Sequence, residues 1–487
     1  MSPRPWIEWT VAALVLGALL ASAADKPMGF DEGIWFHVAR AWVDDGVPPY
    51  QGPIENKSPG IYYVFALSYL AAGVGETLPR AAGVAAVLGA CLACYVLARR
   101  LAGREAGLAA ALIAGLVMAS PGLDGADTSA TESFMVFAST VAIARAGSAS
   151  AREGRHRRRA MLQSGAALGA AVAFKQIAVV TAPALVAFAW ALTPEQARTG
   201  RRVAADAAWM TLGAVAMTAA SLAPLWVAGV SPSEYFEGAW LILFDPGSGF
   251  PAPKPALDRL ATHNVWLTSP LAVLVLGAAA FLVLRQRLRR RVPWGPLALW
   301  IVLDSFGALA ARTFFPHHFK QLVPAMAVAG GILISEAIDA AATRPWGRHA
   351  RGAALACVAL LLLPYSSIVH RVVGPSRDRA RADQLEVAGW IRRHSEPGDG
   401  VFTFVGGGLI QAASERPSPT RYFNRNFIKT DAAVSTVRHD LRARPPRIIV
   451  IEHKVPVWLQ DDLDHCCTLV HTVAKYFLIF ERRRLER

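Results

Sequence analysis

Two adjacent carboxylates, Asp31 and Glu32, lie directly after the first hydrophobic segment of the chain. They begin the segment 31–40, which is otherwise rich in apolar and aromatic residues. Charged side chains close to the hydrocarbon of a membrane are costly and usually have a function. A carboxylate at such a surface can act as a general base that deprotonates a hydroxyl group. The pair is therefore the first candidate for chemistry.

Further charged side chains occur where other hydrophobic segments begin or end. Glu132 begins one segment, Lys57 lies in the loop 55–60, and Lys175 separates two apolar runs. The loop 312–321 adds these cations and histidines: Arg312, His317, His318 and Lys320. Each residue alone could be an interfacial anchor or a lysine that extends toward water. They can form one site only if they share one side of a membrane.

The composition predicts a polytopic α-helical membrane protein, because 54% of the residues are hydrophobic and only 18% are charged. A helix that crosses about 30 Å of hydrocarbon needs about 20 mostly apolar residues. About eleven segments fit this description: 6–24, 81–98, 105–120, 132–147, 160–174, 177–192, 203–228, 264–284, 293–311, 319–338 and 352–369.

The net charge of +14 does not indicate nucleic-acid binding, because no basic face is interleaved with exposed aromatic residues. The arginines gather instead in short loops: Arg99/Arg100/Arg104, 152–159, Arg198/Arg201/Arg202, 285–291 and Arg344/Arg348/Arg351. The positive-inside rule places such loops in the cytoplasm, where anionic lipid can also attract them. The loops that contain the candidate residues, and everything after about 370, then lie outside.

This assignment depends on the segment 60–74, which could be counted as a further span. The segment is too short to cross a bilayer, and its three tyrosines are typical of a membrane interface. We therefore predict a helix on or dipping into the outer leaflet. With this choice all five arginine clusters fall inside.

A second interfacial helix is predicted at 31–45. A helical projection places Trp35, Val38 and Trp42 in one apolar stripe, as in a helix that lies in the interface plane. Asp31 lies in line with this stripe, whereas Glu32 is rotated to its flank. The alternative is that Asp31 only caps the helix, since aspartate is a preferred N-cap residue.

The first segment could be a cleaved signal peptide, since Arg4 precedes it and the residues 21–23 resemble a cleavage site. An uncleaved helix is favoured, and either alternative leaves Asp31 on the same side.

The five cysteines indicate no disulfide framework, metal site or redox role: Cys91, Cys94 and Cys357 lie within spans, and Cys466 and Cys467 are adjacent.

The composition changes near residue 375, which predicts two domains. Residues 1–374 would form the multi-span membrane domain, with an external loop at 25–79 that carries the interfacial helices. Residues 375–487 contain short apolar strands at 401–405 and 447–451 and a helix near 378–394. They predict a small extracytoplasmic α/β domain. The glycines 406–408 are interpreted as a turn, because no phosphate-binding pattern follows them.

Two acids and several cations on one side of the membrane predict a site for a phosphorylated lipid. In these motifs the chain resembles the GT-C superfamily of polyprenyl-phosphate-sugar-dependent glycosyltransferases, in particular the bacterial branch related to protein O-mannosyltransferases and the aminoarabinose transferase of lipid A. The resemblance depends on the order and sidedness of these segments: Asp31-Glu32, 56–63, 131–135, 174–176, 312–324 and 416–422. It covers nearly the whole chain.

The resemblance implies transfer of a sugar from a polyprenyl-phosphate donor to an acceptor hydroxyl outside the plasma membrane. Asp31 would be the base, and Glu132 a second acid that orients the acceptor or supports the site. The departing phosphate is an anion that needs cations and no proton. Donor-binding candidates are Glu32, Lys57, Lys175, Arg312, His317, His318 and Lys320. The acceptor would be a glycan, a lipid or a protein.

Some residues depart from the pattern or add to it. Ile34 stands where the aminoarabinose transferases carry an arginine, which disfavours that substrate. Asp304 lies within a predicted span, on the same helical face as Arg312. It would either form an ion pair that supports the site or contact the substrate. No histidine and aspartate cluster has metal-ligand spacing, so no obligatory metal or other cofactor is predicted.

The main alternative is a transporter or flippase of a lipid-linked substrate. Transporters tend to carry their ionisable groups near the bilayer midplane, on broken helices and often in repeated halves. Here the predicted spans are nearly free of charge apart from Asp304, and the candidate residues gather at one surface. This pattern favours glycosyl transfer.

Overall fold

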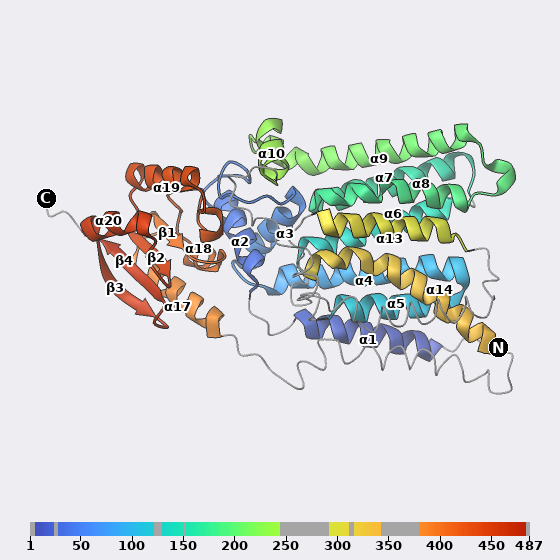
Figure 1. Cartoon of the computed structure of the whole chain (residues 1–487), viewed down its shortest axis with the longest axis horizontal. Coiled ribbons are helices and arrows are strands. Elements are labelled where there is room, and N and C mark those ends of the chain that lie inside the picture. The colour runs from blue at the N-terminus through green and yellow to red at the C-terminus, as the bar shows by residue number, and fades with distance from the viewer. Residues whose placement is uncertain are drawn as a thin grey trace. The chain divides into compact units, whose positions relative to one another are not determined.

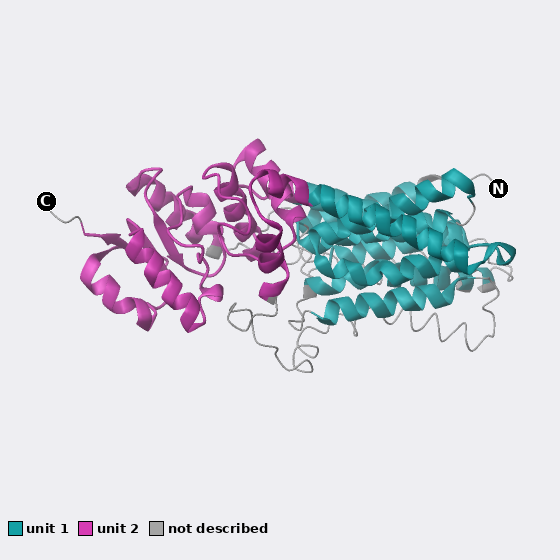
Figure 2. Ribbon diagram, turned by 90° about the horizontal axis from the view of Figure 1, so that it is seen from above, with its two compact units in different colours: residues 1–26, 80–221, 253–376 teal, residues 27–79, 222–252, 377–487 magenta. Residues whose placement is uncertain are grey.

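The structure is a computed structural model that describes residues 5–23, 28–120, 129–149, 152–243, 292–310, 316–341 and 379–483. The chain forms two compact units (Figure 2). Unit 1 comprises residues 1–26, 80–221 and 253–376, and unit 2 comprises residues 27–79, 222–252 and 377–487. The predicted boundary at 375 stays a prediction, but the contacts group the segment 27–79 with the C-terminal residues.

Unit 1 consists of helices that run side by side (Figure 1). Its helices are α1 (Pro5–Ala23), α4 (Thr77–Ala102), α5 (Arg104–Met118), α6 (Thr131–Ala149), α7 (Gly154–Phe174), η2 (Gln176–Thr181), α8 (Ala182–Ala191), η3 (Glu195–Ala197), α9 (Gly200–Val227), α13 (Trp294–Ala310), η6 (Pro316–Leu322) and α14 (Val323–Ala341). Helix α4 begins and α9 ends within the segments of unit 2.

The predicted spans agree with these helices. Two of the predicted segments, 264–284 and 352–369, lie outside the described residues. Each of the others coincides with a helix or with a 3-10 turn that leads into one. Among the described helices, Thr77–Ala102 and Gly200–Val227 are long and apolar enough to cross a membrane. The number of spans therefore stays a prediction.

Small residues allow the helices of unit 1 to approach closely. Gly165 of α7 faces the backbone of Met210 in α9, and Gly213 of α9 faces the backbone of Leu162 in α7, with no room for a Cβ atom at either glycine. Such packing is typical of membrane helices, in which lipid provides no hydrophobic driving force between helices.

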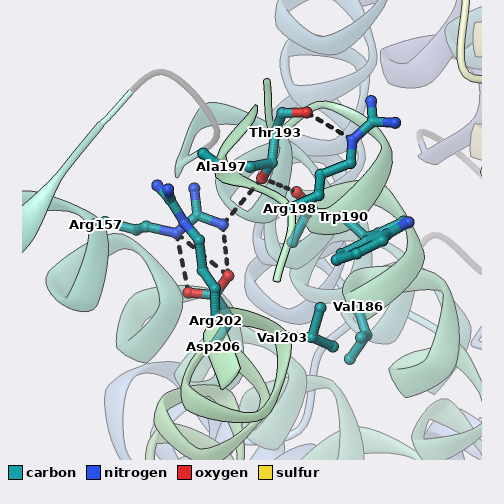
Figure 3. A pocket seen from close by; sticks show the side chains of 10 residues that line it. Arg157, Val186, Trp190, Thr193, Ala197, Arg198, Arg202, Val203 and Asp206 are labelled. Carbon is teal, nitrogen blue, oxygen red and sulfur yellow. Dashed lines mark hydrogen bonds and ion pairs between the residues drawn. The ribbon is translucent and has the colours of Figure 1, made fainter. Parts of the chain in front are cut away.

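A buried ion pair joins the same two helices at another point. The Arg157 guanidinium donates through Nε to the carboxylate of Asp206 at 3.0 Å, and its other nitrogens donate to Thr193 Oγ1 and the Ala149 carbonyl. Figure 3 shows this pair beside Thr193 and Arg198. Because the buried guanidinium has several partners, it is compensated inside the helix packing.

Unit 2 combines helices with one sheet. Its elements are α2 (Phe30–Val43), α3 (Pro59–Ala72), α10 (Pro232–Ala239), η4 (Leu241–Leu243), α17 (Arg379–His394), β1 (Val401–Phe404), α18 (Leu409–Ser414), η8 (Arg425–Phe427), α19 (Asp431–Ala443), β2 (Ile448–Glu452), α20 (Val457–Cys466), β3 (Cys467–Val473) and β4 (Phe477–Arg482). The strand order is β1-β2-β4-β3. Strands β1 and β2 are parallel, and β4 is antiparallel to both β2 and β3.

The sheet is covered on both faces. Ile448 and Val450 of β2 pack in one apolar cluster with Ile391 of α17. Ile449 packs in a second cluster with residues of α19 and α20, among them Val437, Leu459 and Leu463. Alternate residues of a strand point to opposite faces, so a strand with helices on both faces is apolar throughout. This confirms the predicted strands and helix of the C-terminal segment.

Helix α2 is buried on all sides, so the predicted burial of a single stripe is wrong, whereas the place of this helix at the membrane interface stays a prediction. Residues 32–41 are all buried. Trp35 and Phe36 stack edge-on against Phe65 of α3, with ring centroids 5.3 Å and 4.7 Å apart. On another side, α18 packs against Gly33. Hydrophobic periodicity identifies a helix but does not reveal how many neighbours cover it.

The glycines 406–408 form the turn that leads from β1 toward α18. Gly407 has a φ of +86°, in the left-handed region that favours glycine. A Cβ atom on Gly408 would lie 2.6 Å from the carbonyl oxygen of Gly33, and one on Gly33 would lie 2.6 Å from the Leu409 nitrogen. The glycines thus permit direct contact between the backbones of α2 and α18.

Candidate functional site

The candidate residues fall into two groups, one in each unit. The Glu132 cluster consists of Glu132, Lys175, His317 and His318 in unit 1. The Asp31 group consists of Asp31, Glu32, Glu55 and Lys57 in unit 2. Each group is described by itself.

Glu132 is the second residue of α6 and is only 3% exposed. Its Oε1 atom is in direct contact with the ammonium of Lys175, and its Oε2 atom accepts a hydrogen bond from Thr131 Oγ1 at 2.9 Å. The helix N-terminus also favours a negative charge at this position. The carboxylate is therefore held as an anion by several partners.

Lys175 reaches Glu132 from a break in the chain. Helix α7 ends at Phe174, Lys175 has an extended backbone (φ −154°, ψ 122°), and η2 begins at Gln176. The interruption places one polar residue between two apolar helical segments. The lysine side chain is 18% exposed, so it is partly accessible to a ligand.

Two histidines complete the cluster from a third element. His317 and His318 lie in η6, and the Nε2 atom of each is 3.9 Å from Glu132 Oε1. Their rings meet edge-on with centroids 4.7 Å apart. Three nitrogen-bearing side chains thus lie beside one buried carboxylate. Together they can carry more positive charge than the single negative charge of Glu132.

The same geometry could hold a metal ion. One donor atom each from Glu132, His317 and His318 lies within 4.8 Å of the others. Two histidines and one glutamate are a known ligand set for catalytic zinc. The Lys175 ammonium occupies the same carboxylate oxygen, however. The cluster is therefore a candidate metal centre that the sequence spacing did not reveal.

Asp304 is buried in α13 and has two polar partners. Its Oδ1 atom accepts hydrogen bonds from Thr181 Oγ1 at 3.1 Å and from Gln321 Nε2 at 3.3 Å. The predicted partner Arg312 lies outside the described residues. Asp304 thus joins α13 to η2, which follows Lys175, and to η6, which carries His317 and His318. Sequence reasoning missed Thr181 and noted Gln321 only as part of the loop 312–321, because neither has a chemically distinctive context.

Lys320 also lies in η6 and is 1% exposed. The contacts that define the Glu132 cluster are made by its neighbours His317 and His318 and not by this lysine. Its assignment as a donor-binding residue stays a prediction.

The two adjacent carboxylates of α2 have different environments. Glu32 is 1% exposed, and its Oε2 atom accepts a hydrogen bond from the Gly29 backbone nitrogen at 2.6 Å, as in a capping box. Asp31 is half-buried, and its carboxylate makes no hydrogen bond or ion pair within the described part of the chain. The N-cap residue is Gly29. The alternative that Asp31 is the N-cap residue is therefore wrong. Glu32 is buried although the helical projection places it at the flank of the apolar stripe.

Glu55 adds a carboxylate that sequence reasoning noted only as part of a loop. It is buried, and Lys57 Nζ lies 3.7 Å from its Oε1 atom. Burial raises the pKa of Glu55, the Lys57 ammonium opposes this shift, and the negative charge of Asp31 adds to it. Asp31, Glu55 and Lys57 thus interact electrostatically within unit 2. An acidic residue two positions before a lysine, in the segment 55–57, was the only sequence signal.

A family model supports a relationship to known transferases. The model of dolichyl-phosphate-mannose-protein mannosyltransferases matches residues 56–226. No curated protein matches the chain in sequence.

Solved structures share the fold over nearly the whole chain. ArnT from Cupriavidus metallidurans, solved bound to undecaprenyl phosphate, is 15% identical with a TM-score of 0.66, and the match covers 98% of each chain. The oligosaccharyltransferase AglB from Archaeoglobus fulgidus, solved with an inhibitory peptide and a dolichol-phosphate, is 13% identical with a TM-score of 0.56, over 92% of this chain and 70% of that one.

A third structure is larger than this chain. The arabinofuranosyltransferase AftD from Mycobacteria is 15% identical with a TM-score of 0.59, and the match covers 100% of this chain and 40% of that one. Residues 56–226 thus match the model of the mannosyltransferase family, and nearly the whole chain shares the fold of ArnT, AglB and AftD.

Proposed function

We propose that this protein transfers a sugar from a polyprenyl-phosphate donor to an acceptor hydroxyl on the extracytoplasmic side of the plasma membrane. The observation that carries the proposal is the convergence of Lys175, His317 and His318 on the buried carboxylate of Glu132. Such a cluster can neutralise an anion in a site of low polarity. The phosphate of a lipid-linked donor is an anion of this kind.

The chemistry requires one base and several cations. The acceptor oxygen attacks the anomeric carbon, the bond from that carbon to the phosphate oxygen breaks, and the hydroxyl proton passes to a carboxylate. The phosphate leaves with its electron pair, so cations stabilise it and no acid is needed. A glycosidase, in contrast, uses two paired carboxyl groups. We assign the phosphate to Lys175, His317 and His318 of unit 1, and Lys57 stays a candidate from the sequence.

Asp31 is the proposed base. Its carboxylate is half-buried and has no hydrogen-bond partner among the described residues, whereas its neighbour Glu32 is occupied by the helix cap. A positioned base contributes about 10² to 10⁴ in rate. Glu132 is paired with Lys175, which favours a role in orienting the cations over a role in proton transfer.

The test uses purified protein in liposomes with a labelled polyprenyl-phosphate sugar and a mixture of cell-envelope acceptors. We expect Asp31→Asn to lower sugar release by about 10² or more. Glu32→Gln is the matched control. We assign Glu32 to the helix cap and no longer to the donor, and Gln keeps an oxygen that can accept the cap hydrogen bond, so most of the activity should remain. Undiminished transfer by Asp31→Asn would reject the assigned base.

The same preparation separates transfer from transport. If no donor is consumed by the wild-type protein but the lipid-linked sugar changes leaflet, the protein is a transporter and the proposal fails. Sidedness is tested separately by labelling of cysteines introduced into the segment 152–159, at the start of α7, which should react only from the cytoplasmic side.

A further inference from the structure

A cavity of about 490 Å³ lies in unit 2, beside the sheet of the C-terminal segment. Residues of α19, α20, β2 and β4 contribute to its wall. Its lining includes three arginines and an aspartate: Arg438, Arg442, Arg482 and Asp462. Asp462 forms ion pairs with Arg438 and Arg442, both at 3.4 Å. The proposed glycosyl transfer uses none of these residues.

Cys466 and Cys467 also line this cavity. Cys466 ends α20 and Cys467 begins β3, so the junction of helix and strand turns both side chains toward each other. Their Sγ atoms are 2.7 Å apart, and both cysteines are free thiols. A disulfide bond is about 2.05 Å long, so little movement separates the pair from bonding. Adjacency in sequence did not indicate this approach.

We propose that Cys466 and Cys467 are a reversible redox site that closes to a disulfide between adjacent residues in the wall of this cavity. Cys466 is the half-buried member and Cys467 is 5% exposed. Access from the cavity therefore favours Cys466 as the first sulfur to react. Burial and the neighbouring Cys466 thiol raise the pKa of Cys467 to about 12, which agrees with a second, resolving role.

The reaction is an exchange with a small-molecule disulfide. The Cys466 thiolate attacks one sulfur of that disulfide, whose sulfur–sulfur bond breaks to release one thiolate. The Cys467 sulfur gives up its proton and attacks Cys466, which releases the second thiolate. The two cysteines are oxidised, and the small disulfide is reduced to two thiols.

Covalent geometry makes this bond easy to reverse. Adjacent Cα atoms are about 3.8 Å apart, below the usual range of about 4.4 to 6.8 Å for disulfide-linked residues. Such a disulfide is strained and is reduced readily. Cys467 packs in the apolar cluster with Leu459 and Leu463 and pairs with Arg482 across the sheet. Closing the bond therefore alters the cavity wall.

The experiment exposes the full-length protein in detergent to glutathione disulfide, blocks free thiols, and analyses peptides by mass spectrometry. We expect the peptide that contains both cysteines to lose two hydrogens, and dithiothreitol to restore the free thiols. Cys467→Ser should abolish the internal bond and retain glutathione on Cys466. A Cys91→Ser/Cys94→Ser variant, altered at two buried cysteines of α4, should behave as wild type.

The same measurement on protein unfolded in urea tests whether the fold brings the two sulfurs together. The fraction of internal disulfide should be several times lower in the unfolded chain, because only the fold holds the sulfurs together. Equal fractions in folded and unfolded protein would reject a role for the structure. Free thiols, or glutathione on both cysteines, in the folded wild-type protein would reject the redox site.

Discussion

The carboxylate of Glu132 is in direct contact with the ammonium of Lys175, although 43 residues separate them in sequence. The first lies at the start of α6 and the second at the break between α7 and η2. Both histidines of η6 face the same carboxylate oxygen. The pair thus joins three elements of unit 1 and forms the centre of the candidate donor site.

Removal of one partner should be costly. Lys175→Met leaves the Glu132 carboxylate buried without its ammonium, and loss of one partner of a buried pair typically costs about 3 to 5 kcal/mol. We expect a clearly lower melting temperature in detergent for this variant. The double variant Lys175→Met/Glu132→Gln removes the buried charge and should recover much of that loss.

The double variant also separates stability from catalysis. If Lys175 binds the donor phosphate, the double variant should transfer sugar more slowly than wild type even when the two proteins have the same melting temperature. Wild-type transfer by this stable variant would show that the pair is structural only.

The buried imidazole of His37 should make unit 2 sensitive to acid. Burial, with a smaller contribution from Arg40, holds the pKa of His37 well below its usual value of 6.5. The folded state keeps the ring neutral, while the unfolded chain takes up a proton below about pH 6.5. Stability is therefore lost as the pH falls, by about 2 kcal/mol between about pH 7.5 and 5. Thermal melting of wild type and His37→Phe at both pH values measures this difference.

His37→Phe keeps a ring against Phe423, whose centroid is 4.5 Å from the imidazole. The variant should lose part of the acid sensitivity and little stability at neutral pH. An identical pH dependence in both proteins would contradict the buried neutral histidine.

Chelation should leave sugar transfer unchanged. The Lys175 ammonium already balances the Glu132 carboxylate, so we propose that no metal ion is obligatory. The measurement is the transfer rate after treatment with EDTA and after addition of Zn²⁺ or Mn²⁺. A rate that falls about tenfold and returns with one of these ions would instead assign a metal to Glu132, His317 and His318, and His318→Ala should then abolish the rescue.

Gly33→Ala should weaken unit 2 at the contact between α2 and α18. The new methyl group would lie 2.6 Å from the Leu409 backbone nitrogen, and backbone must shift to make room. Overpacking of this kind costs about 1 to 3 kcal/mol. Gly75→Ala, where no atom lies within 4 Å, is the matched control. Equal melting temperatures of the two variants would reject the close approach.

Much of the fold could be predicted because it depends on local patterns. Apolar runs identified the helices of unit 1, and short apolar strands identified the C-terminal domain, since length and periodicity are properties of consecutive residues. The pairing of β4 between β2 and β3 was not predicted, because strand order depends on contacts between distant segments. The residues of the Glu132 cluster were each named from sequence, but their contact was not.

The sequence by itself determined that the chain is helical and apolar, that Asp31, Glu132 and Lys175 follow one another at segment ends, and that a small α/β domain follows. Only the tertiary structure decided which of the two adjacent carboxylates of α2 accepts a backbone hydrogen bond. In α2 the backbone cap occupies Glu32 and leaves Asp31 without a hydrogen bond among the described residues. The helices and 3-10 turns of unit 1 place Lys175 and two histidines beside Glu132. Partners are set by packing between elements far apart in sequence, which no local pattern contains.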